Sequence, residues 1–139
     1  MSHDKHEPLI THSGRTLFTV GELRCKGSGM LQLAPGFDRE LKALRLALDE
    51  PMIVSSGCRS AEHNESVGGH PRSLHVCDKP HHPTGGCAAV DIRTQDAAYR
   101  ARLVRLALER GWSVGVHARF IHLDRRTDYT DRNQALFLY

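Results

Sequence analysis

Three residues of metal-binding type stand beside or within short apolar segments. His75 follows a leucine, Asp91 follows a run of small apolar residues, and His122 lies within the segment Phe120–Asp124. Buried carboxylates are rare unless they are paired or bind a metal. Two histidines and a carboxylate form a catalytic zinc set with the fourth tetrahedral position open for water. Such a zinc ion lowers the pKa of its water and polarises a carbonyl, which suits amide hydrolysis.

The same residues allow a purely structural interpretation. Asp91 would then cap a helix, and His75 and His122 would be hydrogen-bonded groups of the core. The three candidate ligands are dispersed, and no HExxH helix holds them together. Their spacing alone therefore leaves both interpretations open.

A second set of possible ligands lies in the segment 70–88, which is rich in proline, glycine and histidine. Cys77, His81, His82 and Cys87 are ligand types of a structural zinc site, although their spacing matches no common zinc finger. Cys77 and Cys87 could instead form a disulfide in an oxidising space, because they bracket one segment. A loop of this length is more often functional than incidental.

Composition excludes several classes of protein. The chain has 139 residues, 40% hydrophobic and 25% charged, which fits one globular domain. The net charge of +3 is too small and scattered to indicate nucleic-acid binding, and no apolar run reaches membrane-spanning length. The segment Met1–His12 lacks the apolar core of a secretory signal, and four cysteines without one indicate synthesis in a reducing compartment.

The hydrophobic pattern predicts an α+β domain over residues 15–139 behind a flexible tail over 1–14. Leu41, Leu44 and Leu48 recur at helical spacing, and Pro51 ends that helix. Thr94 is expected to cap a later helix that stops at Gly111. The predicted helices are 38–50, 60–67 and 95–110, and the predicted strands are 52–55, 88–92, 112–116, 120–124 and 136–139.

Five motifs in order resemble the zinc D-alanyl-D-alanine carboxypeptidase family, especially its small phage and prophage members that cut peptidoglycan peptides. The similar segments are Phe18-Thr19-Val20-Gly21-Glu22-Leu23-Arg24-Cys25, Ser56-Gly57-Cys58-Arg59-Ser60 with His63-Asn64, Val67-Gly68-Gly69 with Ser73-Leu74-His75, Ala89-Val90-Asp91-Ile92, and Gly115-Val116 with Phe120-Ile121-His122-Leu123-Asp124. The resemblance covers about residues 17–126. It implies a hedgehog/D,D-peptidase-like single domain, with a small antiparallel sheet and helices packed around it.

The resemblance also implies roles for particular residues. It makes His75, Asp91 and His122 the zinc ligands, the same three that burial and residue type select. It places Arg59 where a guanidinium engages substrate or stabilises charge, and such a fork suits a carboxylate or a peptide carbonyl. Ser73 is expected to hydrogen-bond substrate or to orient its loop.

The chain departs from the family pattern at three places. Cys58 replaces the usual tyrosine, and an insertion over 77–87 lengthens the gap between the first histidine and the aspartate. Arg119 stands three residues before His122, where many relatives carry an acidic general base. Two residues remain candidates for proton transfer, His117 and Asp124. Asp124 would share a strand face with His122, and it is expected chiefly to orient that histidine.

The expected function is a zinc-dependent peptidase of phage or prophage origin that acts on peptidoglycan stem peptides or cross-bridges. A non-catalytic zinc-containing cell-wall-binding or virion component is the alternative, and Arg119 favours it. The expected state is a monomer that binds peptide substrate, with no nucleic-acid partner and no membrane span. Cytoplasmic synthesis without an export signal implies that phage release or virion delivery brings it to the cell wall or periplasm.

Overall fold

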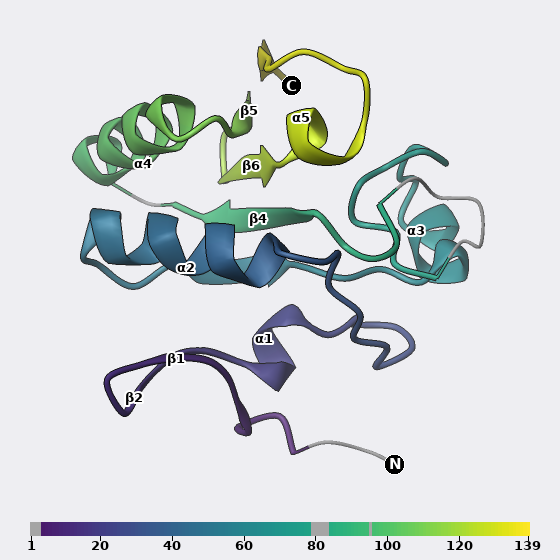
Figure 1. Ribbon diagram of the computed structural model, residues 1–139. Coiled ribbons are helices and arrows are strands. Elements are labelled where there is room, and N and C mark those ends of the chain that lie inside the picture. The colour runs from purple at the N-terminus through teal and green to yellow at the C-terminus, as the bar shows by residue number, and fades with distance from the viewer. Residues whose placement is uncertain (1–3, 79–83, 95) are drawn as a thin grey trace.

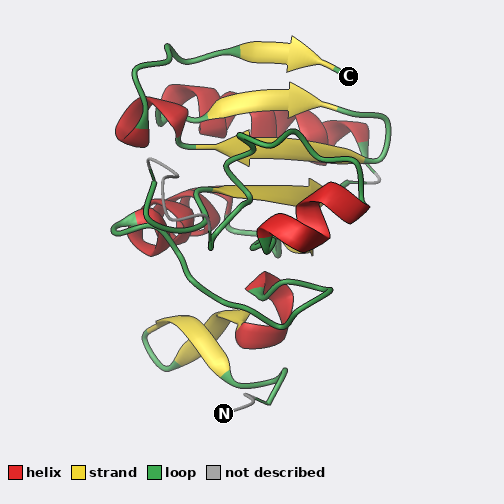
Figure 2. Ribbon diagram, turned by 90° about the vertical axis from the view of Figure 1, so that its right-hand side faces the viewer, coloured by secondary structure: helices red, strands yellow, loops and turns green. Residues whose placement is uncertain are grey.

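A five-stranded sheet forms the centre of the computed structural model, which describes residues 4–78, 84–94 and 96–139 (Figure 1). Neighbouring strands are antiparallel except for the last pair, which is parallel. Figure 2 shows the strands stacked above one another, with the two ends of the chain at opposite ends of the molecule. The strand order is β3 (Ile53–Ser56), β4 (Ala89–Arg93), β6 (Phe120–Asp124), β5 (Ser113–Val116) and β7 (Leu136–Leu138).

Two long helices supply much of the core. Helices α2 (Phe37–Leu48) and α4 (Ala97–Glu109) contact each other, and α4 also contacts β5 and β6. The leucines at helical spacing in α2 are buried as predicted. Helix α4 begins later than expected, because Asp96 rather than Thr94 is its N-cap and accepts a hydrogen bond from the Ala98 amide at 2.7 Å.

The N-terminal segment departs from the flexible tail expected for residues 1–14. Strand β1 (Pro8–His12) pairs with β2 (Arg15–Thr19) in an antiparallel hairpin, and Ile10 is buried against the core. Ser13 and Gly14 make the turn with positive φ angles of 51° and 77°, which suit a two-residue hairpin loop. The burial of one apolar side chain therefore orders a segment that its polar composition alone suggests is frayed.

Three short helices complete the fold, and the α+β class is confirmed. They are α1 (Val20–Leu23), α3 (Ala61–Ser66) and α5 (Arg126–Tyr129). Thr19 and Glu22 form a capping box at α1. Within the described residues, no helix is both long and apolar enough to cross a bilayer.

Candidate metal centre and active site

Sheet register brings two of the predicted ligands together. Asp91 in β4 lies directly opposite His122 in β6, and the pairing places both side chains on one face of the sheet. The third residue, His75, comes from the loop after α3. The amide of Ala88, just before β4, donates to the carbonyl of Leu74 at 2.8 Å. That hydrogen bond holds the loop beside the strand that carries Asp91.

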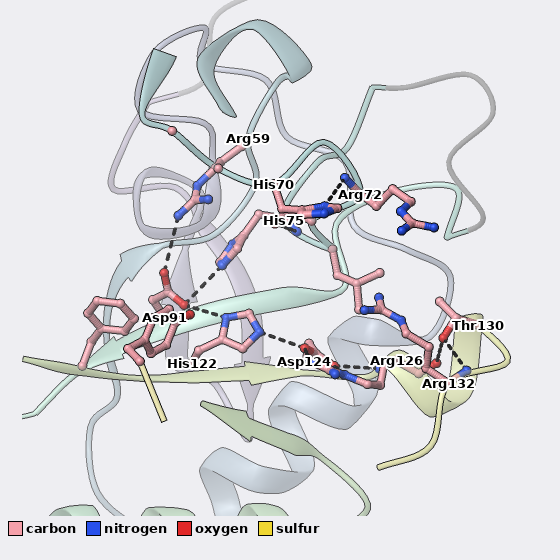
Figure 3. A pocket seen from close by; sticks show the side chains of 16 residues that line it. Arg59, His70, Arg72, His75, Asp91, His122, Asp124, Arg126, Thr130 and Arg132 are labelled. Atoms are coloured by element: carbon pink, nitrogen blue, oxygen red, sulfur yellow. Dashed lines mark hydrogen bonds and ion pairs between the residues drawn. The ribbon is translucent and has the colours of Figure 1, made fainter. Parts of the chain in front are cut away.

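The three side chains converge and are buried. Asp91 Oδ1 lies 2.9 Å from His122 Nδ1 and 3.2 Å from His75 Nε2, as Figure 3 shows. One possible ligand atom from each residue lies within 4.8 Å of the others. No other set of three such side chains meets that distance among the residues the structure describes. Tertiary structure therefore gathers the three residues that the sequence singles out.

A second hydrogen bond fixes each imidazole in an orientation that suits metal binding. His75 Nδ1 lies 2.7 Å from the carbonyl oxygen of Gly57, so this nitrogen must carry a proton and leaves Nε2 free as a ligand. His122 Nε2 lies 2.8 Å from Asp124 Oδ2, which leaves Nδ1 as the ligand atom. Such outer partners are typical of metal-binding histidines. The donor set, its burial and its outer contacts fit a zinc ion.

The charges of the set are strongly coupled. Burial alone would raise the pKa of Asp91, but the two histidines hold it well below its usual range. Burial lowers the pKa of His75, against the attraction of Asp91. Burial alone would also lower the pKa of His122. Hydrogen bonds to Asp124 and Asp91 have the larger, opposite effect and raise the pKa of His122 to about 9. Without metal, His122 is therefore the protonated imidazole of the set near neutral pH.

This charge state predicts that zinc affinity rises with pH. Zinc must displace the proton of His122, so apparent affinity should increase about tenfold per pH unit between about pH 6.5 and 8.5. Competition against a chromophoric chelator measures this slope. Asp124→Asn removes one of the partners that raise the pKa, so its slope should be shallower and its affinity about 10–100-fold lower. Equal slopes in the two proteins would contradict the assignment.

The metal-binding set lies in a pocket of about 680 Å³ whose walls carry several cations. The pocket is lined by Arg59, Gly68, Gly69, His70, Arg72, Ser73, Leu74, His75, Asp91, Phe120, His122, Asp124, Arg126, Thr130, Arg132 and Tyr139. Segments from both halves of the chain therefore meet at this pocket.

Arg59 and Ser73, the two predicted substrate contacts, both line this pocket. Arg59 Nη2 lies 3.5 Å from Asp91 Oδ2, while its Nε donates to Ser56 Oγ at 3.0 Å and its Nη1 donates to Asn64 Oδ1 at 3.2 Å. The Ser73 hydroxyl accepts a hydrogen bond from the His75 amide at 3.2 Å. The guanidinium is thus held over the metal-binding set, and Ser73 orders the turn that presents His75.

The two candidates for proton transfer occupy different surroundings. Asp124 lines the pocket, but its carboxylate is engaged by His122 and by two nitrogens of Arg126, at 2.8 and 3.0 Å. His117 lies on the turn between β5 and β6, where its ring stacks on Phe120 with centroids 4.3 Å apart. His117 is not among the residues that line the pocket. The structure thus brings Asp124, and not His117, to the predicted site.

Several pocket residues carry no signal in the sequence. Arg72, Arg126 and Arg132 lie on one side of the pocket (Figure 3). Tyr139, the residue after β7, also lines it. These residues belong to no recognisable motif, and only Arg126, two residues after Asp124, has a spacing that predicts a shared site. Arg132 and Tyr139 reach the pocket because the C-terminal segment turns back and adds β7 beside β5, whereas Arg72 lies in the loop that carries His75.

The inserted segment is described only in part. His81 and His82, two of the four residues in the second possible zinc set, lie outside the described residues. Cys77 and Cys87 are buried with free thiols, so the structure does not contain the disulfide considered between them.

An α+β domain with a buried His-Asp-His set at the base of an open pocket defines a candidate metal-dependent hydrolase. The family model for Peptidase M15 matches residues 18–124, and the chain belongs to this family of zinc D-Ala-D-Ala carboxypeptidase-like peptidases. The match begins in β2 and ends at Asp124, so it contains all three candidate ligands. A search of curated proteins finds no match to the chain.

Proposed function

We propose that the protein is a zinc-dependent peptidase that hydrolyses peptide bonds in peptidoglycan stem peptides or cross-bridges. One observation carries the proposal: His75, Asp91 and His122 converge, buried, at the base of a pocket in a chain of the M15 peptidase family. Families of this kind combine a metal with a water-accessible cavity to cleave amides.

Five residues of the pocket have specific roles in this proposal. His75, Asp91 and His122 would hold the ion, which supplies Lewis acidity and lowers the pKa of water. Asp124 positions His122 through its contact with Nε2. Arg59 is held by Ser56 and Asn64 with its guanidinium at the edge of the set. There it binds the carbonyl oxygen or the carboxylate of the substrate and stabilises the negative charge that develops on oxygen.

The cations of the pocket support a substrate that carries carboxylates, as stem peptides do. Arg59 and Arg126 pair with aspartates of the site. Arg72 and Arg132 are exposed, and no described residue forms an ion pair with either guanidinium. Two cations on one side of the pocket are placed to attract the free carboxylates of a peptide.

Replacing both arginines should therefore weaken binding more than catalysis. For a double Arg72→Ala and Arg132→Ala variant we expect KM for a carboxylate-bearing stem peptide to rise about tenfold, with kcat little changed, since exposed charge pairs contribute about 0.5–1 kcal/mol each. Steady-state kinetics at low and high salt measure the effect, which salt should reduce. Arg15→Ala, an exposed arginine of β2, is the matched control. An unchanged KM in the double variant would exclude this role.

Proton transfer requires a group that can take up and release a proton near the substrate. We propose His117 as the proton carrier, because its ring packs against Phe120 and Tyr139, which line the pocket. Arg119 occupies the usual acidic position, and Asp124 is engaged by two partners. If His117 carries the proton, His117→Gln should lower kcat while zinc content stays unchanged. A normal rate in this variant would end the assignment.

A non-catalytic cell-wall-binding or virion component with the same zinc site is the second candidate. Arg119 favours this candidate, since an arginine cannot act as a base near neutral pH. Arg119 lies exposed in the turn between β5 and β6. Such a protein would bind zinc and peptidoglycan without releasing peptide fragments.

Digestion of purified peptidoglycan followed by mass spectrometry separates the two candidates. The peptidase should release D-alanine or a cross-bridge fragment, and a chelator should abolish release until zinc is restored. The products also name the bond that is cut. Sedimentation with peptidoglycan, without any new fragment, would support the binding component and contradict the peptidase.

A further inference from the structure

Three buried cysteines form a cluster that the proposed peptidase mechanism does not use. Cys58, Cys77 and Cys87 are at most 3% exposed and form an apolar cluster separate from the main core, with Leu31 and Leu33 packed against it. All three thiols are free. Cys58, Cys77 and Cys87 thus pack together in one cluster.

The backbone brings these cysteines together from three distant segments. The Cys77 amide donates to the carbonyl of Arg59 at 2.9 Å, which ties the start of the inserted segment to the residue after Cys58. The Cys87 amide donates to the carbonyl of Gln32 at 2.7 Å, and the Cys58 thiol donates weakly to the same carbonyl at 3.6 Å. The cluster is therefore anchored by main-chain contacts.

We propose that Cys58, Cys77 and Cys87 are ligands of a second, structural metal site that binds zinc. Thiolates are the ligands that structural zinc sites prefer, usually in a tetrahedral set of four. A disulfide would use two of the sulfurs and leave the third buried beside it, whereas one zinc ion uses all three. The inference is independent of the peptidase activity and adds a site that the family match does not describe.

Zinc binding requires the cluster to contract. The three sulfurs are not gathered as tightly as the ligand atoms of His75, Asp91 and His122, and zinc holds thiolates at about 2.3 Å. Rotation of a cysteine side chain about one bond moves its sulfur by a distance of this order, so the backbone contacts can remain. A further ligand, from solvent or from the chain, completes the tetrahedron.

The position of the cluster gives the second metal a structural purpose. Cys58 immediately precedes Arg59, Cys77 lies two residues after His75, and Cys87 lies four residues before Asp91. A metal that joins the three cysteines would hold in register the three segments that carry these active-site residues. It would do so where an insertion lengthens the connection between His75 and Asp91.

Cobalt titration of the full chain, reduced and stripped of metal, tests the proposal. Co²⁺ should bind with two equivalents, and one of them should give the near-ultraviolet charge-transfer bands of thiolate ligands. His122→Ala should keep these bands and lose one equivalent. Cys87→Ser should lose the bands and keep one equivalent. Cys25→Ser is the matched control and should behave as the wild type, because Cys25 lies outside the cluster, where its thiol accepts from the Ser28 and Ser60 amides.

The wild-type spectrum decides the question even if a cysteine variant fails to fold. One equivalent without thiolate bands would overturn the proposal. A count of free thiols in protein denatured without reductant provides a second check. Two thiols fewer than the sequence contains, together with no thiolate bands, would overturn the metal site in favour of a disulfide. Either result leaves the peptidase proposal intact if peptidoglycan is still cleaved. Thiolate bands in a protein that releases no fragment would support the second site and count against the peptidase.

Discussion

Replacing His122 with alanine should remove the active-site zinc and abolish peptide hydrolysis. Nδ1 of His122 is the nitrogen available to a metal and lies 2.9 Å from Asp91 Oδ1, while its Nε2 connects the set to Asp124. The loss of an outer partner of a zinc ligand costs about 10–100-fold in affinity, and the loss of the ligand itself should cost more. Metal analysis should show one equivalent fewer than in the wild type, and peptidoglycan should yield no fragments.

The control for this variant is a histidine outside the pocket. His12 is exposed at the end of β1, so His12→Ala should keep both metal and activity. Removing the buried imidazole also takes away a positively charged partner of the Asp91 and Asp124 carboxylates. The fold of the variant should therefore be checked by circular dichroism. A folded His122→Ala protein with its full zinc content would refute the assigned site.

Replacing Arg59 with alanine should lower kcat by about 10²–10³-fold while zinc remains bound. The guanidinium is fixed by Ser56 and Asn64 and lies 3.5 Å from Asp91, so it is oriented before substrate arrives. A fixed cation aimed at a developing negative charge contributes on this scale to catalysis. Kinetics on a defined stem peptide, with metal analysis of the same sample, measure both quantities.

Arg59→Lys tests the geometry of this interaction. Lysine keeps the charge but lacks the planar fork that binds two oxygens and spans Ser56 and Asn64, so it should recover only part of kcat. Because Arg59 also contacts Asp91, thermal unfolding of both variants separates a catalytic loss from a structural one. If Arg59→Ala retains normal kcat, the charge on the substrate must be stabilised by another group.

Some parts of the fold could be predicted from the sequence because local signals determine them. Leucines at helical spacing followed by a proline predicted α2, and short apolar runs predicted β3, β4 and β6. The metal-binding set was predictable for a similar reason. A histidine or an aspartate beside or within a short apolar segment is expected to be buried, and burial leaves such a group few roles besides pairing or metal binding.

Other features depended on contacts that no local pattern encodes. The burial of Ile10 turned an expected tail into β1, and the return of the C-terminal segment brought Arg132 and Tyr139 to the pocket. Stacking on Phe120 holds His117 on its turn, outside the lining of the pocket. The placement of such residues depends on how distant segments pack, so spacing along the chain could not decide it.

The sequence by itself determined which residue types could bind a metal and which strands would carry Asp91 and His122, because burial and periodicity are local properties of a chain. Tertiary structure alone decided which nitrogen of each histidine is available to a metal, that Asp124 holds His122, and that three cysteines from separate segments meet. These outcomes depend on hydrogen bonds to groups such as the Gly57 carbonyl, which is 18 residues from His75 along the chain.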